Sequence, residues 1–245
     1  MIDMENVELF NEYYDELFPV SEDIKEFYLE ITKKYKMPTR FLRIASNTGG
    51  LEYHLALEGH DVTGLEEELS LLESASRRRR YPNTALRFLN MSSLEMTHFL
   101  GEGFYNVISV LHNQLLFIHD EILIKKFFFD CKKLLSQDGS LVLQLWNLEG
   151  RHPSPMLAMP TIESERAKLF YQIWQETERF SLNMDIERSN GKIYPVLTKT
   201  EIQLYRPSDI KKLAEEAGFQ SIAFYADFQK NPFTKESEML LAVLS

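Results

Sequence analysis

Short apolar runs alternate with amphipathic stretches between residues 40 and 148. Each run has the length of a buried strand, and the stretches between them carry apolar residues three and four positions apart, as helices do. Strands that alternate with helices in this way are typical of right-handed βαβ units and a parallel sheet. The expected strands are FLRIAS, DVTGL, ALRFLN, YNVISVL and SLVLQLW, and the expected helices cover residues 51–58, 69–80 and 120–135.

Both flanks of this region have a different pattern. Residues 5–36 place apolar side chains at helical spacing around Pro19, which predicts two helices, the second capped by Ser21. From residue 149 to 206, prolines precede three strand-like runs, at 169–174, 182–188 and 193–205. Asn190-Gly191 predicts a type I′ hairpin turn between the last two, because both residues tolerate positive φ.

The end of the chain completes the expected sheet. A helix is predicted over 208–217, capped by Ser208 and closed by Gly218, followed by strands at 221–225 and 239–244. The predicted fold class is α/β, doubly wound, with a seven-stranded, mostly parallel sheet whose final strand is antiparallel. We expect a single domain with N-terminal helices (1–37), a core (38–148 and 206–245) and a small antiparallel insertion after the fifth strand (149–205).

Composition narrows the classes of partner. The 245 residues are 44% apolar and 26% charged, as in a globular domain, and the formal net charge of -10 disfavours a nucleic-acid partner. Cys131 is the only cysteine, so neither an intramolecular disulfide nor a cysteine-built zinc site is possible, and the histidines lack metal-ligand spacing. We see no export signal and no apolar run of ~20 residues, so we expect a cytoplasmic protein that does not cross a membrane.

The segment FLRIASNTGGLEYHLALEGHDVTGLEEELSLLESA resembles the first motif of the class I S-adenosylmethionine-dependent methyltransferases. Sequences of that superfamily read apolar, apolar, Asp, x, Gly, x, Gly, x, Gly at this point. Here the Asp is replaced by Arg43, the first Gly by Ala45 and the second by Asn47, and only the third remains, as Gly49. The element order extends the resemblance from about Tyr14 to Ser245.

The resemblance implies an S-adenosylmethionine site at the carboxyl ends of the strands. Glycines there let the backbone approach a ligand at a helix N-terminus. Glu66 would accept both ribose hydroxyls, although an acid favoured by the next helix dipole is an alternative role. Asn90 would accept a hydrogen bond from the adenine amino group. The implied cofactor-binding residues are Ala45, Asn47, Thr48, Gly49, Leu65, Glu66, Asn90, Met91 and Leu111.

Arg43 conflicts with a cationic cofactor. A guanidinium roughly 5 Å from a sulfonium would repel it by ~3 kcal/mol at an effective dielectric constant of about 20. Two arrangements would remove the conflict. Arg43 could pair with an acid such as Glu12 or Glu66, or it could hold the carboxylate of the ligand.

Four residues are candidates for contact with the methyl acceptor. His112 and Asn113 follow the fourth strand, Trp146 ends the fifth, and Tyr14 lies in the N-terminal segment that folds over the ligand in similar enzymes. For His112 a satisfied, noncatalytic histidine is the alternative, and for Tyr14 it is helix packing. No catalytic residue is implied, because S-adenosylmethionine carries the chemistry. Arg77–Arg80 are interpreted as a solvated helix end.

The expected function is methyl transfer from S-adenosylmethionine to an unidentified small molecule. The departures at Arg43, Ala45 and Asn47 leave open a catalytically inactive binding or regulatory protein with weak or absent cofactor binding. A nucleotide or another adenosyl ligand in place of the cofactor is a third hypothesis, because Arg43 would favour an anion. The sequence leaves the oligomeric state open.

Overall fold

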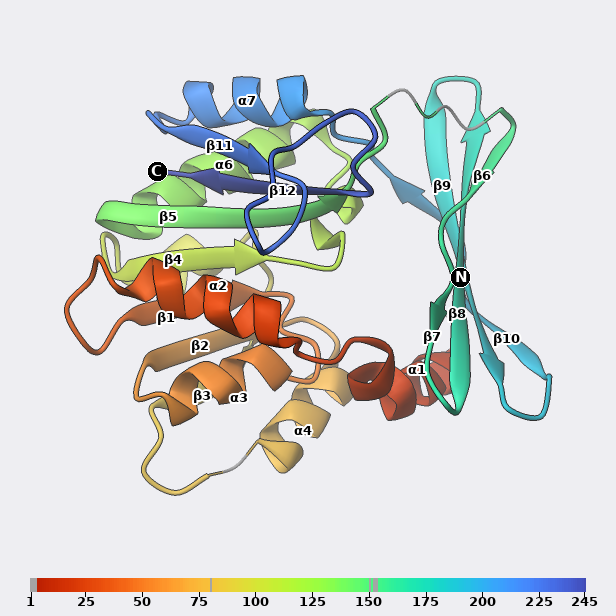
Figure 1. Ribbon diagram of the computed structural model, residues 1–245, viewed down its shortest axis with the longest axis horizontal. Coiled ribbons are helices and arrows are strands. Elements are labelled where there is room, and N and C mark those ends of the chain that lie inside the picture. Colours follow the sequence, from red (N-terminus) through yellow and green to blue (C-terminus); the bar gives the residue numbers. More distant parts are fainter. Residues whose placement is uncertain (1–3, 80, 150, 152–153) are drawn as a thin grey trace. The chain divides into compact units, whose positions relative to one another are not determined.

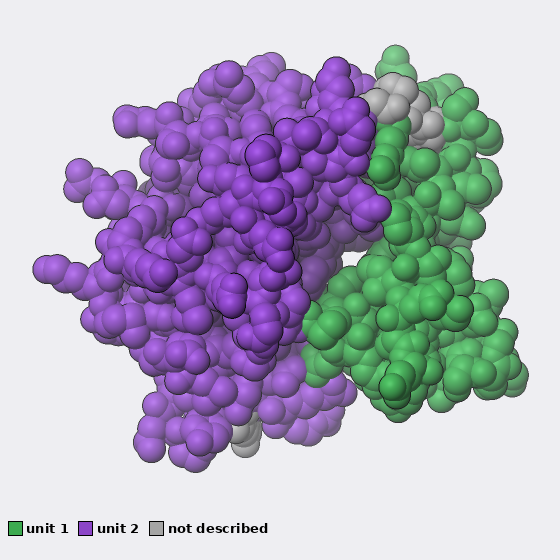
Figure 2. Space-filling view, viewed as in Figure 1, with its two compact units in different colours: residues 1–19, 150–204 green, residues 20–149, 205–245 purple. Residues whose placement is uncertain are grey.

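The computed structural model describes residues 4–79, 81–149, 151 and 154–245. They belong to two compact units, coloured separately in Figure 2. The large unit consists of residues 20–149 and 205–245, and the small unit consists of residues 1–19 and 150–204. The expectation that the whole chain is one domain stays a prediction.

The large unit contains a seven-stranded sheet in the order β11-β12-β5-β4-β1-β2-β3 (Figure 1). Neighbours from β3 to β5 pair in parallel, whereas β12 is antiparallel to both β5 and β11. The predicted doubly wound, mostly parallel sheet is therefore confirmed. Its strands are β1 (Arg40–Ile44), β2 (Asp61–Glu66), β3 (Leu86–Asn90), β4 (Tyr105–Val110), β5 (Leu135–Trp146), β11 (Ile222–Tyr225) and β12 (Met239–Leu244).

Helices cover both faces of this sheet. On one face, Phe41 of β1 packs in a buried cluster with Phe27 of α2 and Leu51 of α3. The next residues alternate in direction, so Ile44 lies on the face that carries Phe127 of α6. The helices are α2 (Glu22–Thr32), α3 (Gly50–Leu57), α4 (Leu69–Arg78), α5 (Met96–Phe99), the 3₁₀ helix η1 (Gln114–Phe117), α6 (Glu121–Leu134) and α7 (Pro207–Glu216).

Helix caps agree with the sequence in one place and differ in another. The Ser21 side chain accepts a hydrogen bond from Ile24 N at 3.4 Å and caps α2, as predicted. The predicted Ser208 cap is wrong, because α7 already begins at Pro207. Proline suits the first helical position, where no backbone N–H is needed, and Asp209 accepts a hydrogen bond from Arg206 N at 2.8 Å.

The small unit combines α1 (Met4–Leu17) with an antiparallel sheet in the order β10-β9-β8-β6. Its core joins one face of α1 to alternate residues of the strands, among them Phe10, Leu169 and Ile186. The chain therefore separates its two N-terminal helices: α1 packs with the inserted strands and α2 with the large sheet. The strands are β6 (Met156–Ala158), β7 (Ile162–Glu163), β8 (Ala167–Glu176), β9 (Arg179–Arg188) and β10 (Ile193–Ile202).

The hairpin between β9 and β10 lies where Asn190-Gly191 predicts it, but the predicted type I′ turn is wrong. Gly191 has a φ of 76°, whereas Asn190 is not left-handed. Gly191 N donates to Arg188 O at 2.8 Å, and Arg188 N donates to Lys192 O at 3.0 Å. A three-residue loop with one left-handed glycine therefore closes the hairpin, which needs positive φ at only one position.

Candidate active site

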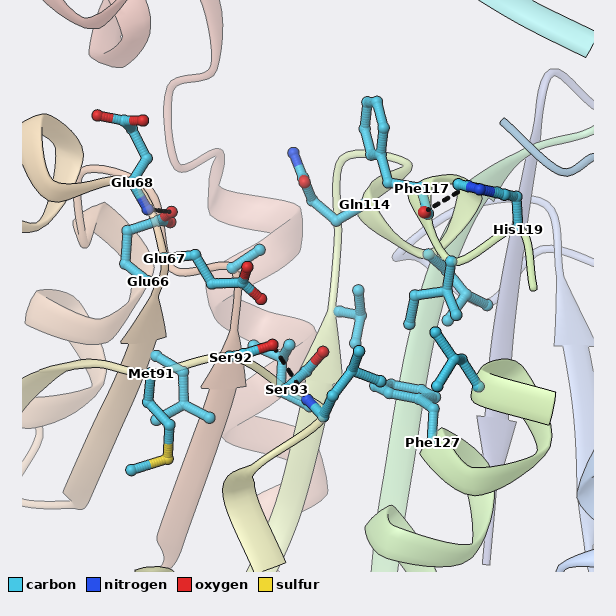
Figure 3. Close-up of a pocket in the computed structure, with 18 of the residues that line it drawn as sticks. Glu66, Glu67, Glu68, Met91, Ser92, Ser93, Gln114, Phe117, His119 and Phe127 are labelled. Carbon is cyan, nitrogen blue, oxygen red and sulfur yellow. Dashed lines mark hydrogen bonds between the residues drawn. The ribbon is translucent and has the colours of Figure 1, made fainter. Parts of the chain in front are cut away.

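A cavity of about 470 Å³ lies in the large unit, where β1, β2, β3 and β4 end (Figure 3). In an open parallel sheet this edge is the usual place for a ligand, because polar backbone groups and loops converge there. Residues that line the cavity are Ile44, Ala45, Leu65, Glu66, Glu67, Glu68, Met91, Ser92, Ser93, Leu94, Val110, Gln114, Leu115, Phe117, Ile118, His119, Asp120, Leu123 and Phe127.

The loop between β1 and α3 keeps a glycine-type backbone although two of its three glycines are replaced. Ala45, Asn47 and Gly49 have φ values of 53°, 52° and 71°, all left-handed. Asparagine tolerates this region better than most residues, whereas a left-handed alanine costs roughly 1–2 kcal/mol. Alanine and asparagine therefore raise the conformational energy of this loop, but the backbone still has positive φ at all three positions.

Gly49 is also required by its surroundings. A Cβ on Gly49 would lie 2.3 Å from Cζ of Phe88, a residue of β3, and a Cβ on Gly64 would lie 2.6 Å from Cδ1 of the same ring. Such contacts are far shorter than van der Waals distance. The Phe88 ring thus occupies the space that both glycines leave, which explains why the third glycine is present.

Glu66 ends β2 and is 6% exposed. Its Oε2 accepts a hydrogen bond from Asn47 N at 2.7 Å, and its Oε1 accepts one from Glu68 N at 3.0 Å. Burial raises the pKa of this carboxyl, and these backbone hydrogen bonds act in the opposite direction. A backbone hydrogen bond from Glu67 also reaches this carboxylate, which leaves about one of its roughly four acceptor positions for a ligand.

Arg43 forms a buried ion pair with Glu52 of α3. The Nε of Arg43 lies 3.3 Å from Oε1 of Glu52, and the two side chains are 5% and 2% exposed. Burial raises the pKa of Glu52 to about 7, although the guanidinium lowers it. The expected partners Glu12 and Glu66 are therefore wrong: the acid comes from the helix that follows the loop.

The charge of Arg43 is directed away from the cavity wall. Ile44 lines the cavity and Arg43 does not, as expected for neighbours on one strand. Its Nη1 donates to Ile44 O at 3.2 Å and to Ser109 O at 3.3 Å. The expected repulsion of a cationic cofactor is thus reduced by pairing and by direction.

The residues after β3 divide between the cavity and the backbone. Asn90 does not line the cavity; its Nδ2 donates to Glu66 O at 2.9 Å and to Glu67 O at 3.0 Å. Met91 lines it, as do Ser92 and Ser93. The amide of Asn90 therefore holds the end of β2, and a cofactor contact by Asn90 stays a prediction.

The segment after β4 is held by β5. His112 and Asn113 have φ values of 54° and 63°. His112 N donates to Oε1 of Gln144 at 2.5 Å, and Trp146 N donates to Oδ1 of Asn113 at 2.6 Å. Burial, with the charge of Arg43 as a smaller cause, lowers the pKa of His112 to about 3, so the ring is neutral.

The structure brings together only part of the predicted site. Ala45, Leu65, Glu66 and Met91 line the cavity, whereas Asn47, Thr48 and Gly49 are in the adjoining loop. Leu111 is a buried core residue, and neither His112, Asn113 nor Trp146 lines the cavity. Tyr14 belongs to the small unit, where its ring lies 5.5 Å from that of Phe10.

The cavity wall is acidic, which the sequence analysis missed. Glu67, Glu68 and Asp120 line it together with Glu66, and no Lys or Arg does so among the described residues. Figure 3 shows Glu66–Glu68 on one side of the cavity and Phe117, His119 and Phe127 on the other. The acidic residues at the end of β2 are visible in the sequence and could have predicted this charge. That the 114–127 segment lies across the cavity from them depends on the fold.

The described part of the chain offers neither a metal cluster nor a membrane-spanning helix. Within those residues, no group of three or more His, Cys, Asp or Glu side chains could hold a metal ion. None of the helices described here is long and apolar enough to span a membrane.

Comparison with known proteins supports the fold. No protein-family model matches the sequence. A protein of Geobacillus sp. (strain WCH70), named "Putative methyltransferase", is 22% identical over 212 residues, 83% of each chain.

Several solved structures superpose over nearly the whole chain. The CcbJ methyltransferase of Streptomyces caelestis has a TM-score of 0.78 at 20% identity and covers 96% of this chain and 95% of its own. An S-adenosylmethionine-dependent methyltransferase of Clostridium acetobutylicum has a TM-score of 0.77 at 14% identity, over 99% of both chains. CalS10 of Micromonospora echinaspora is an amino pentose methyltransferase solved with S-adenosylmethionine. It has a TM-score of 0.66 at 15% identity and covers 100% of this chain and 97% of its own. The chain therefore has the fold of the class I S-adenosylmethionine-dependent methyltransferases.

Proposed function

We propose that this protein is an S-adenosylmethionine-dependent methyltransferase that acts on a small molecule in the cytoplasm. The observation that carries the proposal is the cavity of about 470 Å³ where the Ala45–Gly49 loop and Glu66 meet at the carboxyl ends of β1 and β2. Function argued from a fold alone is weak, so the chemistry of this cavity is decisive.

The residues present fit S-adenosylmethionine. The cavity volume falls within the ~300–1,000 Å³ of small-ligand pockets. Glu66 retains an acceptor position for a ribose hydroxyl, and Leu65 and Met91 offer apolar surface for an adenine ring. When bound, the cofactor supplies an electrophilic methyl group on a sulfonium.

Charge separates this cofactor from a nucleotide. Carboxylates of Glu66, Glu67, Glu68 and Asp120 line the cavity without a lysine or arginine among the described lining residues. One carboxylate about 6 Å from a unit charge contributes roughly 3 kcal/mol at an effective dielectric constant of about 20, before screening by solvent. The wall thus favours a cation and opposes phosphates, which argues against the nucleotide hypothesis.

The protein's own part in the reaction is binding and orientation. A loop held in place and a carboxylate at the ribose position align the cofactor, and alignment of two reactants supplies much of a rate enhancement. His112 is a poor general base, because a pKa of about 3 leaves little affinity for a proton at neutral pH. We therefore expect an acceptor whose nucleophile needs no strong base, or loses its proton to water.

The test is calorimetric titration of the whole chain with S-adenosylmethionine, S-adenosylhomocysteine and ATP. We expect both adenosyl ligands to bind with micromolar dissociation constants and ATP to bind at least tenfold more weakly. Methyl transfer from labelled cofactor to a panel of small amines and alcohols then identifies the acceptor. Absence of adenosyl-ligand binding at millimolar concentration in the folded protein would favour the inactive alternative.

A further inference from the structure

The β1–α3 loop holds a strained shape that its own residues do not favour. Ala45 and Asn47 stand in left-handed conformations where glycine would be relaxed. Such strain persists only where the surrounding contacts determine the conformation. The contacts that hold this loop therefore decide whether it has its shape before a ligand arrives.

Three peptide groups of the loop are each fixed by a side chain. The Asn47 Nδ2 donates to Ala45 O at 2.7 Å, and Glu66 accepts from Asn47 N. The third contact comes from outside the loop and outside β2: Nε of Arg79 donates to Thr48 O at 3.1 Å. Together with Gly49 N, which donates to Ser46 O at 3.0 Å, this contact fixes the plane of the peptide that joins Thr48 to the left-handed Gly49.

Arg79 contacts the helix after the loop as well. Its guanidinium carbon lies 5.9 Å from the centre of the Tyr53 ring in α3, and its Nη2 would lie 3.7 Å from a Cβ on Gly50. The side chain is half-buried at the end of α4. Arg79 thus links α4 to the loop and to the first turns of α3, so the interpretation of Arg77–Arg80 as a solvated helix end is wrong at Arg79, and Arg80 lies outside the described residues.

We propose that Arg79 is a positioning residue that holds the Ala45–Gly49 loop in its ligand-ready shape, in the place of the two missing glycines. The proposal rests on the proposed function for its effect on cofactor binding, whereas its effect on the loop is independent of that function. The hydrogen-bond donor at Nε carries the role, and the positive charge does not.

Three variants separate donor from charge. Arg79→Met removes the donor and keeps an unbranched side chain, whereas Arg79→Gln places an amide N–H where Arg79 has Nε but removes the charge. Arg77→Met is the matched control, because Arg77 is exposed on the same helix end. Affinity for S-adenosylhomocysteine is measured by calorimetry, together with the midpoint of urea unfolding.

We expect Arg79→Met to weaken S-adenosylhomocysteine binding about tenfold, equivalent to about 1.4 kcal/mol. The affinities of Arg79→Gln and Arg77→Met should remain within about threefold of the parent's. Arg79→Gln keeps a hydrogen-bond donor to Thr48 O, and Arg77→Met leaves that hydrogen bond untouched. If Arg79→Gln binds S-adenosylhomocysteine as weakly as Arg79→Met, or if Arg77→Met loses as much affinity, the positioning role is overturned.

A second measurement tests the loop without any ligand. In a background carrying Ala45→Gly and Asn47→Gly, the loop is relaxed, so Arg79→Met should change the unfolding equilibrium constant about fivefold less than in the parent. Equal changes in both backgrounds would overturn the proposal. Because this cycle needs no cofactor, a parent that binds neither adenosyl ligand would refute the proposed function and leave this test valid.

Discussion

The buried pair of Arg43 and Glu52 makes a prediction about the pH dependence of stability. Attraction at 3.3 Å is about 5 kcal/mol at an effective dielectric constant of 20, and removing both ions from water costs several kcal/mol each. Burial outweighs the attraction, since the pKa of Glu52 is raised to about 7 although Arg43 lowers it. Removing Arg43 alone leaves a buried carboxyl that has lost its partner.

The sign follows from the raised pKa of Glu52. The folded protein holds this proton up to about pH 7, whereas the unfolded chain releases it near 4.5, so the stabilisation present below pH 4.5 is lost as pH rises to 7. In Arg43→Met the pKa should rise further, because buried carboxyls without partners reach about 8–9. The pKa of Glu52 is then about 1.5 units higher in the variant than in the parent. At pH 8.5 this difference lowers the free energy of unfolding of the variant by about 2 kcal/mol relative to the parent, and at pH 5.5 the effect vanishes.

Urea unfolding of parent and Arg43→Met at pH 5.5 and 8.5 measures this change. We expect the cost of the substitution to grow by about 2 kcal/mol between the two values, and a second substitution, Glu52→Gln, to remove the growth. Lys125→Met is the control, because the exposed Lys125–Glu121 pair should contribute less than about 0.5 kcal/mol at either pH. A cost for Arg43→Met that does not change with pH would refute the ion pair.

Other predictions follow from single contacts. Glu66→Ala should weaken S-adenosylhomocysteine binding by at least ~1.5 kcal/mol in calorimetry, whereas the exposed Glu73→Ala should not; equal affinities of parent and Glu66→Ala would remove Glu66 from the site. Ala45→Gly should stabilise the fold by about 1 kcal/mol in urea unfolding, since glycine adopts the positive φ of residue 45 without the strain of alanine. A loss of stability would contradict the positive φ at this position. The His112 ring should show no titration between pH 5 and 8 by NMR, because its pKa is about 3. S-adenosylmethionine and S-adenosylhomocysteine should bind within about fivefold of each other, because Arg43 is paired; a strong preference for the uncharged product would mean that Arg43 reaches the sulfur.

Local patterns predicted the large unit well because each strand and helix there is encoded within its own segment. The run FLRIAS is apolar at every position except Arg43 and Ser46, which is close to the pattern of a strand covered on both faces. Ser21 and Gly218 mark helix ends through hydrogen bonds and a backbone conformation that depend on nearby residues. Ser208 failed as a cap since Pro207 can begin a helix one position earlier.

The path of the β1–α3 loop shows where a motif comparison is too strict. Ala45 and Asn47 depart from the glycine pattern, yet both adopt positive φ, because hydrogen bonds to neighbouring peptide groups compensate for the strain. A sequence reports the propensity of each residue and not the contacts that oppose it. The number of replaced glycines in the motif therefore suggested a larger change in the loop conformation than the structure has.

The sequence by itself determined the order of strands and helices, the parallel sheet, the insertion after the fifth strand and the position of Glu66 beside the cavity. Those properties depend on periodicity and on the rule that the ends of parallel strands meet at one edge. Tertiary structure alone decided that Glu52 lies against Arg43, that Arg79 reaches Thr48 and that α1 packs with the inserted strands. Each of these contacts joins different secondary-structure elements, and only the packing of helices on sheets brings such partners within a few ångströms.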